Sequence, residues 1–382
     1  MIPFNKAPYV EGAEEYVLDV IKSRHLMGDG PYTIKDQEIL EEKTNCRKVF
    51  LTHTGTDALE FACLLADIGP GDEVIVPSFT FPTTAACITL FHGTPVFIDC
   101  HKETMAIDET KIEAAITERT KAIMVMHYAG VGCEMEKICE IAKEHGLLVI
   151  EDAAQVLGAK WNGKALGTFG DIGCISFHQT KNYTMGEGGA IFINNPDLID
   201  RAYILRDSGT NAYAFEQGLV PAYTWVDKGS SYMPSELQAA YLYPQMLKFD
   251  EINKDRVKSF WSYYEKLKDL KETGKLDLPF VPKQAEINGH MFYVKTKDFD
   301  EMNALRKYLK SKDIYASFHY QPLHSAKAGR MFGRFVGEDI NTTAESRRIL
   351  RLPMFYGLTE EEITEVANAI HEFYNKQGDT TK

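Results

Sequence analysis

Lys181 is the residue of this sequence with the clearest chemical use. It stands in a predicted loop between two strands, where a neighbouring cation or an apolar wall can lower a lysine pKa enough for Schiff-base chemistry. Ser176, near the end of the preceding strand, could face a phosphate, and the pair Gly188-Gly189 lets the next strand approach closely. Because a lysine in a loop is usually only solvated, the functional interpretation of Lys181 depends on its companions.

The second candidate is a carboxylate at the end of an apolar strand. The run Val149-Ile150-Glu151-Asp152 predicts a strand whose carboxyl end lies at the edge where open α/β sheets bind ligands. A buried aspartate there can form a charge-assisted hydrogen bond to a protonated ring nitrogen and keep the ring electron-withdrawing. Asp152 is the candidate for that role. The alternative is that Asp152 or Glu151 caps a following helix.

The third candidate is a glycine turn, Thr54-Gly55-Thr56-Asp57, between a predicted strand and a predicted helix. The free N–H groups and the dipole of a helix start favour an anion. Gly55 would let a phosphate come close, and the Thr56 hydroxyl could donate to it. The alternative is that Thr54 or Thr56 is an ordinary N-cap.

The three candidates follow one another in a single α/β region, and together they make a stronger case than each does alone. No G-x-G-x-x-G follows the first strand and no G-x-x-x-x-G-K-[ST] occurs, which argues against dinucleotide and ATP phosphate loops. His, Cys and carboxylate residues show no recognisable metal-ligand spacing, so we expect no metal.

Composition restricts the class of protein further. The formal net charge of −13 argues against a nucleic-acid binder, which needs a basic face. Seven scattered cysteines, never spaced as C-x-x-C, indicate reduced thiols. No signal-peptide pattern and no run of about eighteen apolar residues occurs. We therefore expect a cytoplasmic protein without membrane insertion.

Alternating strand and helix patterns supply the elements that must position the candidates. From about residue 45 to 195 they predict a mostly parallel seven-stranded sheet flanked by helices. The predicted strands span residues 48–52, 73–76, 95–99, 122–127, 147–151, 173–177 and 190–194. A connecting helix is predicted over 134–145, ended by Gly146, with a buried face made of Met135, Ile138, Cys139 and Ala142.

Beyond about residue 234 the pattern becomes mainly helical. Pro244 is expected to kink or break the chain between two helical stretches. The predicted elements are helices over 235–243, 247–267, 300–310 and 360–374, and a strand over 290–295. Thr359 and Glu362 form a capping box for the last helix, whose buried stripe is Ile363, Val366, Ala367, Ile370 and Phe373.

A chain of 382 residues is longer than most single domains, so we expect more than one. The predicted division is an amino-terminal arm and helix in residues 1–45, a large α/β domain in 46–249 and a small α+β domain in 250–382.

Over nearly its whole length the sequence resembles the DegT/DnrJ/StrS sugar aminotransferases, a branch of the fold-type I pyridoxal-phosphate enzymes. The stretches that carry this resemblance are Gly55-Thr56-Asp57-Ala58-Leu59, Pro70-Gly71-Asp72-Glu73-Val74, Pro77-Ser78-Phe79-Thr80-Phe81, Glu151-Asp152-Ala153-Ala154-Gln155, and Ser176 through Lys181 to Gly189. The resemblance implies the fold of a fold-type I transferase, pyridoxal 5'-phosphate as cofactor, and a homodimer with shared active sites.

The resemblance also implies roles at the reacting end of the cofactor. Lys181 would hold the cofactor through a Schiff base, Asp152 would pair with the ring nitrogen, and Gln155 would lie beside the ring oxygen. His178 would support the site, with a purely structural role as the alternative.

At the other end of the cofactor, the resemblance implies that Gly55, Thr56 and Ser176 hold the phosphate and that Phe81 stacks on the ring. Many members of the family place an asparagine from the partner subunit where this chain has Ser231. A serine can still donate to a phosphate, so contact with the partner's cofactor is an expectation for Ser231.

Within the family, the sequence most resembles the transaminases that convert dTDP-4-keto-6-deoxy-D-glucose to dTDP-4-amino-4,6-dideoxy-D-galactose with L-glutamate, a step of cell-surface polysaccharide synthesis. The stretches are Met105-Ala106-Ile107-Asp108-Glu109-Thr110, His127-Tyr128-Ala129-Gly130-Val131, Thr180-Lys181-Asn182-Tyr183-Thr184, Gly229-Ser230-Ser231-Tyr232, and Phe318-His319-Tyr320 with Pro322-Leu323-His324. A nucleotide-linked keto sugar and L-glutamate are therefore the expected substrates. Tyr320 and His324 are candidates for substrate contact, with packing as their alternative.

Three other functions stay open. The first is another nucleotide-sugar 3- or 4-aminotransferase. The second is a sugar 3-dehydrase, which resembles this family but has histidine at the lysine position, so Lys181 argues against it. The third is a binding protein without activity, against which Asp152, Gln155 and Lys181 count together.

Overall fold

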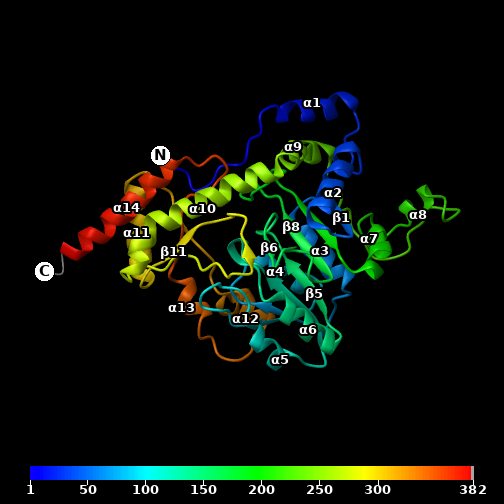
Figure 1. The fold of residues 1–382 in the computed structure, drawn as a ribbon. Coiled ribbons are helices and arrows are strands. Elements are labelled where there is room, and N and C mark those ends of the chain that lie inside the picture. Colours follow the sequence, from blue (N-terminus) through cyan, green and yellow to red (C-terminus); the bar gives the residue numbers. More distant parts are fainter. Residues whose placement is uncertain (380–382) are drawn as a thin grey trace.

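The computed structural model describes residues 1–379 and is built around one large sheet (Figure 1). The strand order is β1-β9-β8-β5-β4-β2-β3-β13. The strands are β1 (Lys48–Thr52), β2 (Glu73–Pro77), β3 (Thr94–Ile98), β4 (Thr120–Met126), β5 (Leu148–Asp152), β8 (Ile172–Ser176), β9 (Gly189–Ile193) and β13 (Arg334–Phe335). The seven predicted strands are confirmed. The edge strand β13 was not predicted, because two residues carry no periodicity.

The directions of the strands gather loops at one edge of the sheet. β8, β5, β4, β2, β3 and β13 pair in parallel, whereas β9 pairs antiparallel with both β1 and β8. β1 therefore runs in the same direction as the parallel strands. Their carboxyl ends share an edge with the amino end of β9, so the segments after β1, β2, β5 and β8 meet the segment before β9.

Helices bury both faces of this sheet, which explains why its strands are nearly continuous apolar runs. Val74 and Val76 of β2 belong to the core that includes α3 and α4, whereas Ile75 belongs to the core that includes α6. The helices of this part are α1 (Ala13–Ser23), α2 (Pro31–Thr44), α3 (Gly55–Leu65), α4 (Pro82–Leu90), α5 (Ile112–Ala115), α6 (Met135–His145), α7 (Ile199–Leu205), α8 (Ala212–Glu216) and α9 (Glu236–Leu247). As predicted, α6 ends at Gly146, which has a left-handed φ of 65°.

Of the kink or break expected at Pro244, the break is wrong. Pro244 lies inside α9, and the chain turns at Lys248 before α10 (Phe249–Glu272) begins. A proline removes the helical donor of the carbonyl four residues before it, here that of Ala240. Since α9 ends three residues after the proline, the loss is confined to its last turns. Figure 1 shows α10 as a long helix that runs from α9 toward α11 and α14.

A smaller antiparallel sheet lies beyond α10, with β14 (Ile349–Arg351) between β11 (Tyr293–Lys295) and β12 (Ser317–Phe318). The accompanying helices are α11 (Phe299–Ser311), α12 (Lys327–Phe332), α13 (Thr342–Ser346) and α14 (Glu360–Asp379). The predicted capping box is present, since Glu362 N–H donates to Thr359 Oγ1 at 3.2 Å and Thr359 N–H donates to Glu362 Oε2 at 3.0 Å. The predicted stripe of α14 is buried.

A third, minor sheet consists of β10 (Ala285–Glu286), β6 (Lys160–Trp161) and β7 (Lys164–Ala165). The division into residues 1–45, 46–249 and 250–382 stays a prediction. Within residues 1–379, no helix has the length and apolarity to cross a membrane.

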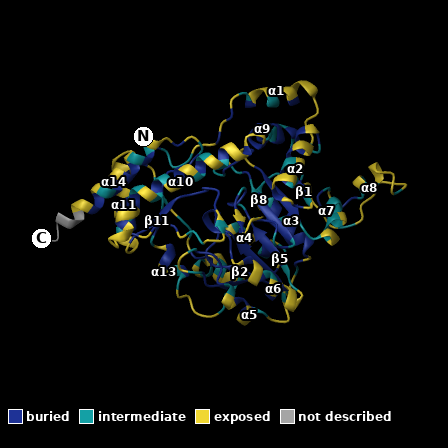
Figure 2. Ribbon diagram, viewed as in Figure 1, coloured by how far each residue is buried: buried dark blue, intermediate teal, exposed yellow. Residues whose placement is uncertain are grey.

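The segment around α8 and the amino-terminal segment are placed differently relative to the rest of the molecule. The segment around α8 projects away from the sheet and is largely exposed (Figures 1 and 2). The amino-terminal segment, in contrast, packs against the rest of the molecule. Ile2 N–H donates to the Asp313 carbonyl at 2.8 Å. The Asn5 amide donates to the carbonyls of Thr180 at 3.3 Å and Met354 at 3.5 Å, so it joins the loop of the candidate lysine to the small sheet.

Candidate functional site

A cavity of about 810 Å³ opens at the shared edge of the large sheet and is closed on its other side by the small sheet. Its lining contains eight of the nine residues predicted to hold a cofactor, together with Tyr320: Gly55, Thr56, Phe81, Asp152, Gln155, Ser176, His178 and Lys181. A larger cavity of about 950 Å³ lies at the opposite edge and is lined by none of them. The chemistry predicted from the sequence therefore converges on the smaller cavity.

Lys181 lies on the cavity wall in the turn between β8 and β9. Its backbone N–H donates to the His178 carbonyl at 2.8 Å, which holds the turn in place. Burial lowers the pKa of the Lys181 amine to about 8, against the opposing attraction of Asp152, and the positive charge of Arg351 lowers it further. Near physiological pH roughly a fifth of the amine is then neutral. An amine of this kind can act as a nucleophile or as a proton acceptor.

Asp152 is held at the end of β5 by two donors and is 4% exposed. Thr84 Oγ1 donates to Oδ2 at 2.7 Å, and Ala154 N–H donates to Oδ1 at 3.2 Å. Thr80 Oγ1 lies 2.6 Å from Thr84 Oγ1. Since the single proton of Thr84 faces the carboxylate, Thr80 donates to Thr84. Burial raises the pKa of Asp152, and the Thr84 hydroxyl is the largest opposing influence.

The alternative that Asp152 or Glu151 caps a following helix is wrong, because the next element after β5 is the short strand β6. Glu151 instead accepts N–H groups from Gly167 at 2.8 Å and Gly170 at 2.7 Å. His127 Nδ1 accepts Cys133 N–H at 3.1 Å, so its Nε2 carries the proton and donates to Glu151 Oε2 at 2.8 Å. Glu151 is therefore satisfied within the sheet.

The start of α3 forms a cradle with unused donors. Thr54 is the N-cap, as its alternative predicted, and accepts Asp57 N–H at 2.9 Å. This contact leaves the N–H groups of Gly55 and Thr56, which have no helical acceptor. A Cβ on Gly55 would lie 2.8 Å from Ser176 Cβ, so glycine is required for the close approach of α3 and β8. The cradle suits an anion.

Gln155 and Tyr320 form a polar pair across the cavity. Gln155 Nε2 donates to Tyr320 Oη at 2.8 Å, while Gln155 Oε1 accepts Ala129 N–H at 2.8 Å. The Tyr320 ring lies 5.4 Å from the ring of Phe79 and 6.1 Å from that of Phe81. Phe81 and Tyr320 therefore contribute one aromatic wall, and Gln155 anchors that wall to β5.

The remaining predicted residues divide into those at the cavity and those away from it. His178 lines the cavity, and its Nδ1 accepts Thr180 N–H at 3.3 Å. Ser231 is exposed and lies outside the lining, so its reach to a partner's cofactor stays a prediction. His324 also lies outside, with Nδ1 2.6 Å from Ser78 Oγ and Nε2 3.3 Å from Asp339 Oδ2. These contacts favour the packing alternative for His324.

Several polar residues of the site were missed by sequence reasoning. Thr80 and Thr84 lie on either side of the start of α4, and their hydroxyls meet only because the chain turns there into the helix. His290 and His319 line the cavity from the small-sheet side, and burial lowers the pKa of both. Arg351 ends β14 in an otherwise apolar run. Nothing local in the sequence of these last three points to the cavity, since tertiary packing brings them there.

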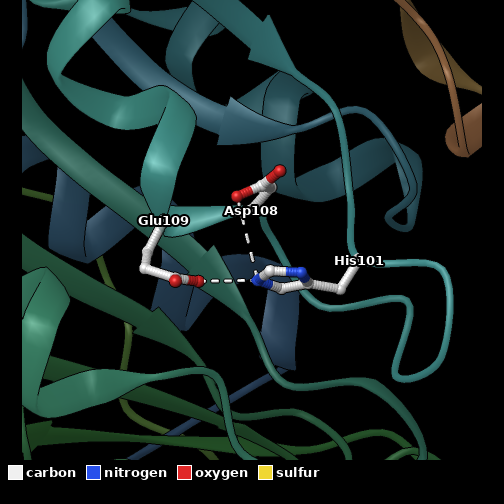
Figure 3. A group of neighbouring side chains, drawn as sticks. All are labelled: His101, Asp108 and Glu109. Carbon is white, nitrogen blue, oxygen red and sulfur yellow. Dashed lines mark hydrogen bonds and ion pairs between the residues drawn. The ribbon is translucent and has the colours of Figure 1, made fainter.

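A separate group of side chains, His101, Asp108 and Glu109, lies outside the cavity lining (Figure 3). His101 Nε2 lies 2.6 Å from Glu109 Oε2 and 3.8 Å from Asp108 Oδ1. The hydrogen bond to Glu109 raises the pKa of His101. Their spacing was not recognised in the sequence, although the three ligand atoms lie within 4.8 Å of one another. Ion pairing accounts for this arrangement.

Comparison with known proteins places this geometry in context. A model described as the DegT/DnrJ/EryC1/StrS aminotransferase family matches residues 10–371. GDP-perosamine synthase of Escherichia coli O157:H7 is 31% identical over 378 residues, which cover 96% of this chain and 97% of that protein. The UDP-N-acetyl-3-dehydro-alpha-D-glucosamine 3-aminotransferase of Acidithiobacillus ferrooxidans is 36% identical over 320 residues, covering 83% of this chain and 82% of that protein.

The fold comparison agrees with the family match. The crystal structure of the aminotransferase TlmJ from Streptoalloteichus hindustanus superimposes with a TM-score of 0.90 at 25% sequence identity. The match covers 99% of this chain and 100% of that one. Both the large sheet and the small sheet therefore belong to one shared architecture.

Proposed function

The chain belongs to the DegT/DnrJ/EryC1/StrS aminotransferase family, and we propose that it transfers an amino group from L-glutamate to a nucleotide-linked keto sugar. Enzymes of this family depend on pyridoxal 5'-phosphate. The proposed reaction converts dTDP-4-keto-6-deoxy-D-glucose and L-glutamate to dTDP-4-amino-4,6-dideoxy-D-galactose and 2-oxoglutarate. We place it in the cytoplasm, in the synthesis of cell-surface polysaccharide.

The observation that carries the proposal is that Lys181 and Asp152 line the same cavity as the anion cradle. The donors and acceptors of this chain fit the cofactor at each end. Gly55 and Thr56 offer free N–H groups beside Ser176, which suit its phosphate. Asp152, buried and kept as an acceptor by Thr84, suits a protonated ring nitrogen. Lys181 offers an amine of lowered pKa for its aldehyde.

Each of these residues then has one task. When bound, the cofactor would supply a ring that withdraws electrons from the carbon that gives up its proton. Asp152 keeps the ring nitrogen protonated, and Gln155, held by its contacts with Ala129 and Tyr320, lies beside the ring oxygen. Gly55, Thr56 and Ser176 hold the phosphate so that the reacting end stays next to Lys181. Phe81 stacks on the ring face, beside Tyr320.

Lys181 carries the proton. A pKa near 8 lets its Nζ accept a proton from the donor's α carbon without a large penalty and give it back in the same turnover. The keto sugar reverses the order of these transfers, so Lys181 serves both substrates. Overall, one amino group moves from glutamate to the keto carbon, and 2-oxoglutarate leaves.

The choice of sugar and nucleotide comes from three stretches of the sequence. Of the two relatives described above, one is named for a GDP-linked sugar. The other is named for a UDP-linked sugar that receives its amino group at position 3 of the sugar ring. The assignment to a dTDP-linked 4-keto sugar depends on the stretches around residues 105–110, 127–131 and 318–324. Of the two candidates for substrate contact, Tyr320 lines the cavity.

A homodimer with shared sites is also part of the proposal. The projecting segment around α8 exposes large apolar side chains, with Leu219 at 74% and Trp225 at 76% exposure. Six exposed large apolar side chains gather in this one segment, which is typical of an interaction surface: Tyr213, Phe215, Leu219, Tyr223, Trp225 and Val226. Ser231 follows this segment directly, so a second copy that covers the segment also brings Ser231 toward another subunit.

Two measurements test the proposed function. The protein reconstituted with pyridoxal phosphate should show an absorbance band of the bound cofactor that L-glutamate changes, and Lys181→Ala should lose both the band and the turnover. A panel of dTDP-, GDP- and UDP-linked 4-keto and 3-keto sugars should single out the dTDP-linked 4-keto substrate. Preference for a 3-keto sugar would support another aminotransferase of the family, and release of a dehydrated sugar would support a dehydrase.

A further inference from the structure

Arg351 is a cation of the cavity wall that the site described so far does not use. Among the described lining residues, Lys181 and Arg351 are the lysine and arginine side chains. Lys181 is committed to the cofactor. Both proposed substrates are anions, since glutamate carries two carboxylates and the nucleotide sugar carries a diphosphate. Arg351 therefore remains to meet one of these charges.

The position of Arg351 is set by the small sheet and the amino-terminal segment. Arg351 ends β14, where it pairs with Tyr293 of β11 and Ser317 of β12. Its Nη2 donates to the Phe318 carbonyl at 3.1 Å. The guanidinium lies over the Phe4 ring, 4.7 Å from its centroid. A strand, a carbonyl and a ring face thus orient the guanidinium before any ligand arrives.

The guanidinium is nevertheless under-satisfied. It has five N–H groups, and Nε is buried without a hydrogen-bond acceptor. Within the described part of the chain, no carboxylate forms an ion pair with it. Burial lowers the pKa of Arg351, which reflects a charge removed from water without a counter-charge. A planar fork with free donors is the group that binds a carboxylate in two-point fashion.

The distance of each substrate anion from the reacting nitrogen identifies the ligand. Phe4, over which the guanidinium lies, is next to Asn5, whose amide donates to the carbonyl of Thr180, the residue before Lys181. Arg351 and Lys181 also line the same cavity, so the guanidinium lies toward its reacting end. In glutamate, the α-carboxylate is bonded to the carbon that carries the amino group. In a 4-keto sugar nucleotide, the diphosphate is attached across the ring from the keto carbon. The α-carboxylate is therefore the anion that comes nearest to Arg351.

We propose that Arg351 binds the α-carboxylate of the amino donor and thereby selects α-amino acids over amines that lack this group. The proposal rests on the proposed function, because it assumes that the donor reacts at Lys181. It makes Arg351 a specificity residue for the donor half of the reaction and leaves the sugar half to other groups.

The experiment compares three donors with the reconstituted protein, without sugar, by following the absorbance of the bound cofactor. L-glutamate carries both carboxylates, 4-aminobutyrate lacks the α-carboxylate, and L-2-aminobutyrate lacks the distal one. Arg351→Gln should raise the half-saturating L-glutamate concentration about tenfold to a hundredfold, as expected for the loss of a charged hydrogen bond. Its preference for glutamate over 4-aminobutyrate should fall by a similar factor, while its preference over L-2-aminobutyrate should change less than about threefold.

Arg347→Gln is the matched control, because Arg347 also lies over an aromatic ring, that of Phe299, but outside the cavity lining. It should behave like the wild type. Arg351→Lys keeps the charge but loses the fork and should fall between wild type and Arg351→Gln, which provides a test if the glutamine variant does not fold. Thermal midpoints and cofactor absorbance report folding and loading.

The outcomes separate the two proposals. If wild type reacts with glutamate but both Arg351 variants keep its preference over 4-aminobutyrate, the role of Arg351 is overturned and the proposed function stands. If the variants lose the preference over L-2-aminobutyrate instead, Arg351 binds the distal carboxylate, which also overturns the inference. If wild type does not react with glutamate, the proposed function itself fails.

Discussion

Replacing Thr84 with valine should move the acid limb of the glutamate half-reaction to higher pH. Thr84 Oγ1 donates to Asp152 Oδ2 at 2.7 Å in a buried environment. This hydrogen bond stabilises the ionised carboxylate and so lowers the pKa of Asp152, against the raising effect of burial. Valine has the shape of threonine without the donor, so the substitution removes the stabilisation and adds little steric change.

The size of the shift follows from the strength of the bond. A hydrogen bond to a charged group contributes about 1.5–3 kcal/mol, and one pKa unit corresponds to about 1.4 kcal/mol. The pKa of Asp152 should therefore rise by about 1–2 units in Thr84→Val. Since the ionised form is the active one, activity should be lost at a higher pH as the pH falls and should recover toward the wild-type rate well above the new pKa.

The assay is the single-turnover rate of the cofactor's absorbance change with saturating glutamate, measured across the pH range in which the protein stays folded. Thr89→Val is the matched control, because Thr89 is also in α4 but donates to the Ala86 carbonyl of its own helix at 2.9 Å. Thr80→Val, which removes the donor to Thr84, should give a smaller shift in the same direction. Coincident acid limbs for Thr84→Val and Thr89→Val would refute this reasoning.

Two further predictions concern the cradle and the dimer. Gly189→Ala should destabilise the fold by about 1–3 kcal/mol and weaken cofactor binding, because the new Cβ would meet the Thr54 carbonyl next to the start of α3. Thermal melts with and without cofactor measure both effects. A melting temperature equal to that of the Gly69→Ala control would contradict the prediction. If Ser231 completes the site of a partner subunit, mixing inactive Lys181→Ala and Ser231→Trp chains should restore about a quarter of the wild-type turnover. Half of the dimers are then mixed, and each mixed dimer has one intact site. No recovery in verified mixed dimers would count against active sites shared between subunits.

The sequence alone predicted the parts of this molecule that depend on local pattern. Central strands such as 122–127 are apolar on both faces and bounded by turns, so their positions were readable without tertiary information. Asp152 and Lys181 were identified because each follows such a strand, and strand ends of a parallel sheet meet at one edge. The capping box at Thr359 and Glu362 is local as well.

The predictions that were wrong or missing concern residues whose contacts lie far along the chain. Glu151 was a possible helix cap, but the N–H groups of Gly167 and Gly170 claim it, and no helix follows. Arg351 reaches the cavity through the pairing of β14 and through Phe4, which is separated from it by almost the whole chain. The break was predicted at Pro244 because proline lacks a backbone donor. The actual turn lies at Lys248, because its position depends on where α10 begins.

The antiparallel direction of β9 fixes the loop that carries Lys181. Ser176 and Gly189 are paired in the antiparallel ladder, and Phe177 N–H donates to the Gly188 carbonyl and Gln179 N–H to the Gly186 carbonyl, both at 2.8 Å. The loop that carries Lys181 is thus held by backbone hydrogen bonds at both of its ends. The opposite wall, residues 317–321, pairs with β14 through the two-residue strand β12 and is held to the other side of the cavity by the hydrogen bond from Gln155 to Tyr320. A loop fixed in this way keeps the Lys181 amine at one place in the cavity, which suits a residue that must meet two substrates in turn.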